Sequence, residues 1–313
     1  MPSLKVVCDH NANFAPKTQP VVVVFGGTSG IGAGTLQAFA HHTKGNVHIV
    51  ILGRAKASAE AIFAALPKHP EGLYEFVSVD ALLMRNIVEV SNELKTNSKG
   101  LLRKPLTKIN YLVLSQGALL LSGPDTDEGL PPFLALSAYG RLRAALELVP
   151  LIEEAARLGE GAQILSIGAA GHGGPVYLED VALRRTSLYR MRGAMITYKD
   201  IMVLEFAARH PTVGFTHIHP GFVSTNFGSN LPWIFRILGQ FFYLFAKSAK
   251  DCGEWMMYAI TEPASGPGPH FKSPQAEDVG ASRFADEVTR GVVWNHSLEA
   301  STPKAVTSGL HEH

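Results

Sequence analysis

The chain has 313 residues, of which 46% are hydrophobic and 18% charged, so it is neither disordered nor fibrous and can bury a large core. Its formal net charge of +1 lacks the basic field typical of nucleic-acid-binding proteins, so no nucleic-acid partner is expected. Two cysteines, Cys8 and Cys252, are too few for a disulfide framework, and the polar N-terminus has no signal-peptide pattern. We therefore expect a cytoplasmic protein.

Short apolar runs alternate with longer helical patterns along most of the chain. The predicted strands are 21–25, 47–52, 74–79, 111–115, 162–167 and 213–218. The predicted helices are 31–42, 57–66, 82–94, 133–158 and 191–209. Several strands are almost continuously apolar, as in strands that are covered on both faces. This alternation predicts the α/β class, with one doubly wound parallel sheet of the Rossmann type.

The domain boundaries follow from composition. Residues 1–18 are predicted to be an N-terminal extension, and 19–262 a single Rossmann domain. Residues 261–275 are rich in Pro, Gly and Ser, which favours a domain end there. The C-terminal extension, 263–313, is expected to be either an ordered addition or a loose tail.

The stretch VVVVFGGTSGIG at 21–32 joins a buried strand to a helix through a glycine-rich turn. Glycines let a phosphate approach the unpaired N–H groups at the start of the helix, where the helix dipole also favours negative charge. The alternative is a tight strand-to-helix turn without a ligand. In this context the pattern predicts that a dinucleotide phosphate is bound by Gly26, Thr28, Ser29, Gly30, Ile31 and Gly32.

Together with the glycine turn, HPGFVSTNF at 219–227 and Asp80 after the third strand resemble the short-chain dehydrogenase/reductase family over about 240 residues. The texture is similar to a divergent fungal branch of that family that acts in secondary-metabolite pathways. By this resemblance, Asp80 holds the adenine, while Val223 and Thr225 border the nicotinamide carboxamide and the phosphates. The resemblance thus implies cofactor contacts from Asp80, Gly117, Pro220, Gly221, Val223 and Thr225.

The second strand ends in LGRAKAS, which offers Arg54 where a site for NAD usually has a carboxylate. A guanidinium can pair with the 2′-phosphate of NADP and has no comparable use for a bare hydroxyl. The alternative is a solvated surface arginine. The sequence favours NADP(H) as the cofactor.

The proton relay of the family, Y-x-x-x-K assisted by Ser and Asn, is not preserved. Ser137 stands at the expected asparagine position, and Gly168 or Ala169 where the serine belongs, with Ser166 two or three residues early. Counting back from the end of its helix, Tyr189 lies closest to the tyrosine position. The sequence therefore predicts Tyr189 as the catalytic acid, assisted by Ser166.

Other candidates for the relay are weaker. Tyr198 and Lys199 are adjacent, so they point about 100° apart on a helix. His172 lies in a glycine-rich loop and is a stand-in acid or a surface histidine. A Y-x-x-x-K does occur at 243–247, after the P-G segment, where it is interpreted as a coincidence. No metal site is predicted.

The resemblance also implies that the segment at 226–258, which is rich in aromatic residues here, covers the substrate. Its most apolar window, 231–246, is shorter than the roughly 20 residues needed to span a bilayer. This window is either a core helix, a pocket wall or a surface that contacts a membrane or a partner. A pocket wall would imply a bulky lipophilic small-molecule substrate.

Three functions compete at this point. The first is an NADP(H)-dependent oxidoreductase that acts on a bulky apolar carbonyl or enone intermediate, with a rebuilt relay. The second is a redox-neutral cyclase, isomerase or dehydratase on the same scaffold. The third is a non-catalytic binding module. A homo-oligomer built on the helix 133–158 is a further expectation, because members of the family are often dimers or tetramers.

Overall fold

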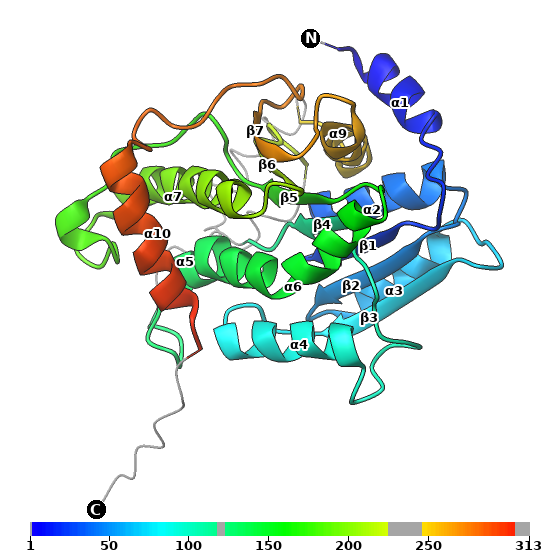
Figure 1. Cartoon of the computed structure of the whole chain (residues 1–313), viewed down its shortest axis with the longest axis horizontal. Helices are drawn as coiled ribbons and strands as arrows, with labels where there is room; N and C mark the ends of the chain where they lie inside the picture. The colour runs from blue at the N-terminus through cyan, green and yellow to red at the C-terminus, as the bar shows by residue number, and fades with distance from the viewer. Residues whose placement is uncertain (1, 118–122, 225–245, 304–313) are drawn as a thin grey trace, which may run out of the picture.

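The computed structural model describes residues 2–117, 123–224 and 246–303. Seven parallel strands form one sheet in the order β3-β2-β1-β4-β5-β6-β7 (Figure 1). They are β1 (Val21–Phe25), β2 (His48–Gly53), β3 (Leu73–Ser78), β4 (Tyr111–Leu114), β5 (Gln163–Ile167), β6 (Gly214–Ile218) and β7 (Gly268–Lys272). Since β1 pairs with both β2 and β4, the strand order reverses beside β1, and the predicted doubly wound Rossmann sheet is confirmed.

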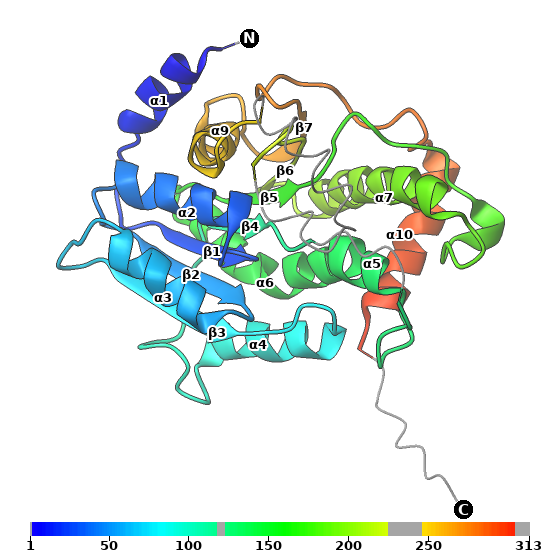
Figure 2. The same cartoon turned by 180° about the vertical axis from the view of Figure 1, so that it is seen from behind.

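Helices cover both faces of the sheet (Figures 1 and 2). One layer contains α1 (Leu4–Ala12), α2 (Gly30–His42), α3 (Lys56–Ala65) and α9 (Ala249–Thr261). The other contains α4 (Met84–Thr96), α5 (Pro132–Leu134), η1 (Ala135–Tyr139), α6 (Gly140–Arg157), α7 (Leu188–Arg209) and α10 (Glu287–Ser301). A short 3₁₀ turn, η2 (Leu178–Asp180), precedes α7. The expected helix 133–158 is continuous, but one turn of it, η1, is a π-helix.

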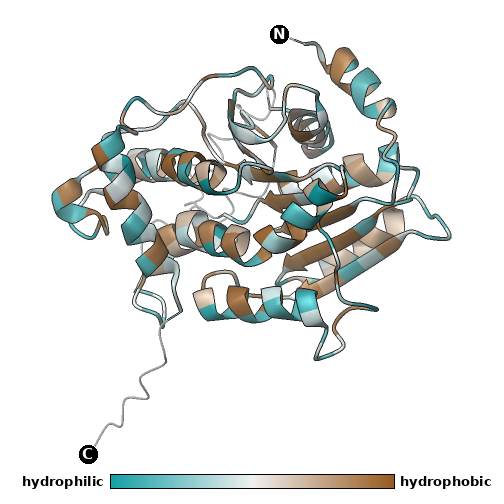
Figure 3. Cartoon of the chain, in the orientation of Figure 1, coloured by the Kyte–Doolittle hydropathy of each residue, from teal (hydrophilic) through white to brown (hydrophobic). Residues whose placement is uncertain are grey.

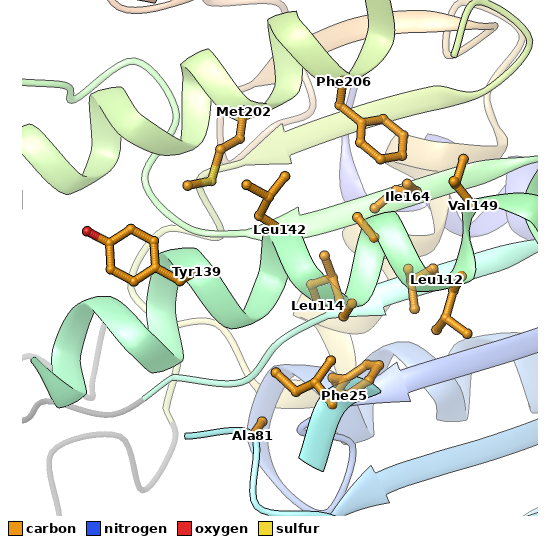
Figure 4. Close-up of a cluster of buried hydrophobic side chains, with 14 of the residues drawn as sticks. Phe25, Ala81, Leu112, Leu114, Tyr139, Leu142, Val149, Ile164, Met202 and Phe206 are labelled. Carbon is orange, nitrogen blue, oxygen red and sulfur yellow. The ribbon is translucent and has the colours of Figure 1, made fainter. Parts of the chain in front are cut away.

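Each face of the sheet has its own hydrophobic core. In Figure 3 brown, hence apolar, residues run along strands in the centre of the sheet such as β1. In Figure 4, Phe25 from β1, Leu114 from β4, Leu142 from α6 and Phe206 from α7 lie in the core beneath α6 and α7. A fully buried side chain of this kind contributes about 1.5–3 kcal/mol relative to an exposed one.

Helix α2, which follows the glycine turn, is held against α9 by close backbone contact. A Cβ added to Gly34 would lie 1.9 Å from the carbonyl oxygen of Ala249, and one added to Gly253 would lie 2.1 Å from the carbonyl oxygen of Gly34. Only glycine at both positions allows this approach. The start of α2 is therefore fixed by packing on the far side from the cavity.

Part of the segment that was expected to cover the substrate has a different role. Residues 226–245, and with them most of the apolar window 231–246, lie outside the described residues. The remainder enters α9, where Trp255 and Met256 are buried in the core shared with α2. The prediction that 226–258 covers the substrate is therefore wrong for α9, because its apolar face packs against the sheet and α2.

Both chain extensions add to the domain. The C-terminal one supplies β7, which pairs with β6, and α10, which packs on α6 and α7. Arg143 on α6 donates from Nε to the carbonyl oxygen of Ser301 at 2.8 Å, and the guanidinium of Arg209 lies 4.6 Å from the ring centre of Trp294. The predicted boundary at 262 was thus too early, and 263–303 is the ordered alternative. At the N-terminus, Asn11 on α1 donates to the carboxylate of Glu254 on α9 at 2.8 Å.

No helix in the described ranges is long and apolar enough to cross a membrane.

Candidate active site

A cavity of about 880 Å³ lies at the carboxyl ends of the strands. Crevices at this edge, beside the reversal in strand order, are where doubly wound sheets bind ligands. The cavity is lined by eleven of the predicted cofactor residues: Gly26, Thr28, Ser29, Gly30, Ile31, Arg54, Asp80, Gly117, Pro220, Gly221 and Val223. Of the remaining predicted residues, Gly32, Ser166 and Tyr189 are not in its lining, and Thr225 lies outside the described residues.

The glycine turn has the geometry needed to receive a phosphate. Gly26 has φ +80°, and a Cβ there would lie 2.8 Å from the backbone nitrogen of Gln116. Gly30 begins α2 with φ +56°, and the preceding N-cap residue, Ser29, makes no side-chain cap bond to the helix. The first N–H groups of α2 are therefore available to an anion. Gly32 has a packing role, because a Cβ there would lie 2.5 Å from the carbonyl oxygen of Gly26.

The ends of β2 and β3 lie on the same side of this turn, because the strand order there is β3-β2-β1. Arg54 is exposed on the rim of the cavity and forms no ion pair with another described residue. Lys56, the other nearby cation, lies 3.8 Å from the carboxylate of Glu60. Asp80 is partly buried, and its Oδ1 accepts a hydrogen bond from the backbone of Leu82 at 3.1 Å. The donors and charges present therefore fit a dinucleotide that carries an extra phosphate.

Tyr189, the predicted catalytic acid, is not brought to the cavity. It lies in the first turn of α7 with 88% of its surface exposed. The face of α7 that lines the cavity presents Arg192, Met195, Ile196 and Lys199. This spacing corresponds to one side of a helix, so the assignment made by counting back from the helix end was about six residues too early. Lys199 thus stands in the cavity, with methionine four residues before it.

The other tyrosine of this helix belongs to the core. Tyr198 is fully buried, and its hydroxyl donates to the carbonyl oxygen of Val181 at 2.7 Å. Burial raises its pKa. Tyr198 and Lys199 therefore point in different directions, as expected for adjacent residues of a helix.

Ser166 is a partner of a buried arginine that the sequence did not reveal. Its hydroxyl accepts from Nη1 of Arg141 at 2.9 Å, and Nη2 of Arg141 donates to the carbonyl oxygen of Gln116 at 2.6 Å. Arg141 also donates to the carbonyl oxygen of Ile167, so it joins the ends of β4 and β5. Burial lowers the pKa of Arg141 to about 9, which leaves it charged at neutral pH. Ser166 therefore helps to hold Arg141 and does not itself face the cavity.

Arg141 could have been found from the position of Ser137. Ser137 lies in the π-helical turn η1 and lines the cavity, as expected for the residue at the asparagine position of the relay. Arg141 is one helical turn further along and lines the same cavity. The signal was an arginine inside an otherwise apolar helix face. Beside it, the side-chain amide of Gln116 is buried and has no hydrogen-bond partner among the described residues.

A buried polar cluster lies behind the cavity. His217 on β6 donates from Nδ1 to Asp200 at 2.6 Å, and its Nε2 accepts from the backbone of Ala169 at 3.2 Å. The second carboxylate oxygen of Asp200 accepts from the backbone of Ser282 at 2.9 Å. Burial lowers the pKa of His217 to about 4, so the ring is neutral at pH 7. Burial, and the nearby charge of Arg141, also lower the pKa of Lys199 well below that of an ordinary lysine.

A pair of histidines lies near the loop after β6. The ring centres of His172 and His219 are 4.7 Å apart, and His219 lines the cavity. Burial lowers the pKa of His219, and the charge of His172 adds to this effect. His172, the suggested stand-in acid, contacts the cavity only through His219.

Comparison with known proteins places these features in context. No family model matches the chain. A protein named as an oxidoreductase in Emericella nidulans is 29% identical over 233 residues, which cover 74% of this chain and 66% of that protein. A short-chain dehydrogenase/reductase of Stachybotrys chartarum is 26% identical over 325 residues, covering 97% and 90% of the two chains. The crystal structure of NADPH-bound carbonyl reductase from chicken fatty liver has the same fold, with a TM-score of 0.59, 17% identity and coverage of 85% of this chain and 100% of that one.

Proposed function

We propose that this chain, which belongs to the short-chain dehydrogenase/reductase family, is an NADP(H)-dependent oxidoreductase for a bulky apolar carbonyl or enone. One observation carries the proposal: the glycine turn, Arg54 on the rim and the loop after β6 line a single cavity. The fungal origin of the two relatives described above supports a further step, a role in secondary-metabolite biosynthesis. Because the Emericella match spans just under two thirds of that protein, its activity is not carried over to this chain.

The cofactor half of the cavity supplies binding and orientation. The N–H groups that begin α2 would hold the pyrophosphate, and Arg54 would pair with the 2′-phosphate. Asp80 would contact the adenine, and Val223, with Thr225, the nicotinamide end. NADPH supplies the hydride.

The other half of the cavity suits an apolar molecule with one polar group. Apolar side chains line it, namely Phe133, Leu136, Met195, Ile196 and Phe222. Arg141 and Lys199 line the same cavity and add positive charge to it. Fixed positive charge of this kind stabilises the negative charge that develops on a carbonyl oxygen during reduction. Contact of 231–246 with a membrane surface and assembly into a homo-oligomer remain separate proposals. The helix 133–158 is already partly covered by α10.

The proposal is tested by titrating the protein with NADPH and with NADH while following nicotinamide fluorescence. We expect tight binding of NADPH that Gly30→Asp abolishes, because a carboxylate would stand where the phosphate binds. Arg54→Ala should weaken NADPH binding about tenfold, the loss of one charge-assisted hydrogen bond, and leave NADH binding unchanged. Binding of neither nucleotide would refute the proposal. Once a substrate is found, the reaction is run with deuterium-labelled NADPH. A product without deuterium would support the redox-neutral alternative.

A further inference from the structure

Gly168, one of the two positions where the serine of the relay was expected, has no space for a side chain. A Cβ added to Gly168, at the end of β5, would lie 2.2 Å from Nε2 of His217 and 2.7 Å from Nζ of Lys199. Real Cβ atoms do not approach other atoms so closely, so no larger residue fits at 168 unless this arrangement shifts. The lysine amine and the imidazole therefore border one point, at the inner wall of the cavity. The absence of a side chain at 168 is what allows them to be there.

Lys199 is set in this wall as an uncommitted donor. Only 5% of its surface is exposed, it lines the cavity, and it forms no hydrogen bond or ion pair with another described residue. Its neighbour His217 is held by Asp200 in the tautomer that carries the proton on Nδ1, and the lone pair on Nε2 accepts from the backbone of Ala169. One turn before Lys199, Met195 occupies the cavity without a proton to give. The ammonium group is thus positioned by its surroundings and free to act on a ligand.

The other polar groups that line the cavity are poor acids. An arginine such as Arg141 does not release a proton near pH 7, and the hydroxyl of Ser137 is too weakly acidic. The pKa of His219 is lowered by burial, so this ring is largely neutral at pH 7. Tyr189 is exposed outside the cavity. Among the described lining residues, Lys199 is the group best able to donate a proton.

We propose that Lys199, which lies beside the buried His217–Asp200 pair, is the catalytic acid of this site and replaces the tyrosine of the family. The inference rests on the proposed oxidoreductase function. One N–H bond of Lys199 breaks as the O–H bond of the product alcohol forms, while the carbonyl carbon gains the hydride whose loss oxidises NADPH to NADP⁺. The electron pair of the C=O π bond becomes the new bond between oxygen and the proton. Solvent water then returns a proton to the neutral amine.

The electrostatic surroundings support this role. Burial lowers the pKa of Lys199, and Arg141, which faces it from α6, lowers it further, whereas Asp200 raises it. His217 faces it from β6 as a neutral ring, and Arg192 and His219 line the same cavity. A lysine whose pKa is brought toward neutral pH transfers protons more effectively than an ordinary one.

The first test measures Lys199 directly and needs neither substrate nor nucleotide. Protein labelled with ¹³C at lysine Cε is titrated by NMR, and the Lys199 signal is assigned by its loss in Lys199→Arg. We expect a pKa well below that of the surface lysines, which rises when Arg141→Met removes the neighbouring charge. A Lys199 signal that titrates with the surface lysines overturns the inference.

The second test measures turnover of NADPH with an apolar aromatic diketone and an enone as probes. Lys199→Arg keeps the charge but gives up the proton donor, so kcat should fall about 100-fold or more with little change in NADPH affinity. In the wild type, kcat should fall as pH rises through the pKa that NMR gives for Lys199. The residual kcat of Lys199→Arg should not fall over this pH range. Tyr189→Phe, which changes an exposed side chain, is the matched control and should behave as wild type.

The outcomes separate the two proposals. Failure to bind NADPH refutes the proposed function itself. If NADPH binds, three results overturn only the assignment of Lys199. These are an ordinary pKa of Lys199, a wild-type kcat in Lys199→Arg, and reduction of neither probe.

Discussion

Replacing Gly26 by alanine tests the glycine turn most sharply, because two separate costs can be worked out from the structure. Gly26 has φ +80°, a left-handed conformation that costs a residue with a Cβ about 1–2 kcal/mol. The new Cβ would also lie 2.8 Å from the nitrogen and 2.9 Å from the Cα of Gln116, and 3.0 Å from the carbonyl carbon of Ser115. These are backbone atoms at the end of β4, so relief requires movement of a central strand. Overpacking of this kind costs about 1–3 kcal/mol. We therefore expect Gly26→Ala to lower the free energy of unfolding by about 2–5 kcal/mol.

Gly159 provides the matched control. It has φ +70°, but no atom lies within 4 Å of where its Cβ would be, and it is not part of the cavity. Gly159→Ala should therefore show the conformational cost alone, about 1–2 kcal/mol. Urea unfolding with linear extrapolation measures both variants against wild type, with equal m-values as the check on two-state behaviour. Equal losses in the two variants would refute the close contact between the turn and β4. NADPH binding should be impaired only in Gly26→Ala.

Three further predictions test other parts of the molecule. Gly291 is exposed within α10, and no described atom beyond its chain neighbours and its own helix backbone lies within 4 Å of its added Cβ. Gly291→Ala should therefore raise the free energy of unfolding, measured by urea titration, by about 0.5–1 kcal/mol, and no increase would contradict the helical placement of this residue. The pKa of His217 falls from 6.5 to about 4 on folding, so the unfolded chain binds more protons between these values and stability is lost as pH falls. Between pH 7 and pH 5 this effect lowers the free energy of unfolding by about 2 kcal/mol. If the free energy of unfolding of the wild type falls no more steeply with pH than that of His217→Gln, the prediction is wrong. Finally, adding Met195→Tyr to the Lys199→Arg variant should raise its kcat at least about tenfold. Adding Met195→Phe instead should leave kcat unchanged, since only the phenol offers a proton.

Most of the fold was predictable because its signals are local. Continuous apolar runs such as 21–25 predicted strands to within one or two residues, and their alternation with helices fixed the class of sheet. The elements that were missed have weak local signals. The strand Gly268–Lys272 lies in a stretch rich in glycine and proline, and it is stabilised by pairing with β6 rather than by its own composition. Helix α10 contains Gly291 and β-branched residues, and it depends on contacts with α6 and α7.

That the glycine turn lines the cavity was also predictable, for the same reason. A glycine at a positive φ and a helix N-terminus are properties of a short stretch of chain, and the predicted residues after β1 line the cavity except Gly32. The register of α7 was not local. Without the family tyrosine as a landmark, the helix end was the only reference, and the count from it led to Tyr189, about six residues before Met195, which lines the cavity. Arg141 was missed because it meets Ser166 and Gln116 only in the folded protein.

The altered residues of the proton relay are connected in the folded chain. A lysine in a relay acts through a tyrosine beside it, and the serine opposite occupies the wall at the end of the fifth strand. Gly168 lies in this wall, and the amine of Lys199 and the ring of His217 border the volume that a side chain would take. The glycine at 168 and the placement of Lys199 and His217 therefore depend on each other. For the same reason, a serine placed at 168 would not restore the family relay: it would collide with a ring that is fully buried and hydrogen-bonded to Asp200. The relay residues that are altered in the sequence thus belong, in the folded chain, to a packed arrangement in which Gly168, Lys199 and His217 depend on one another.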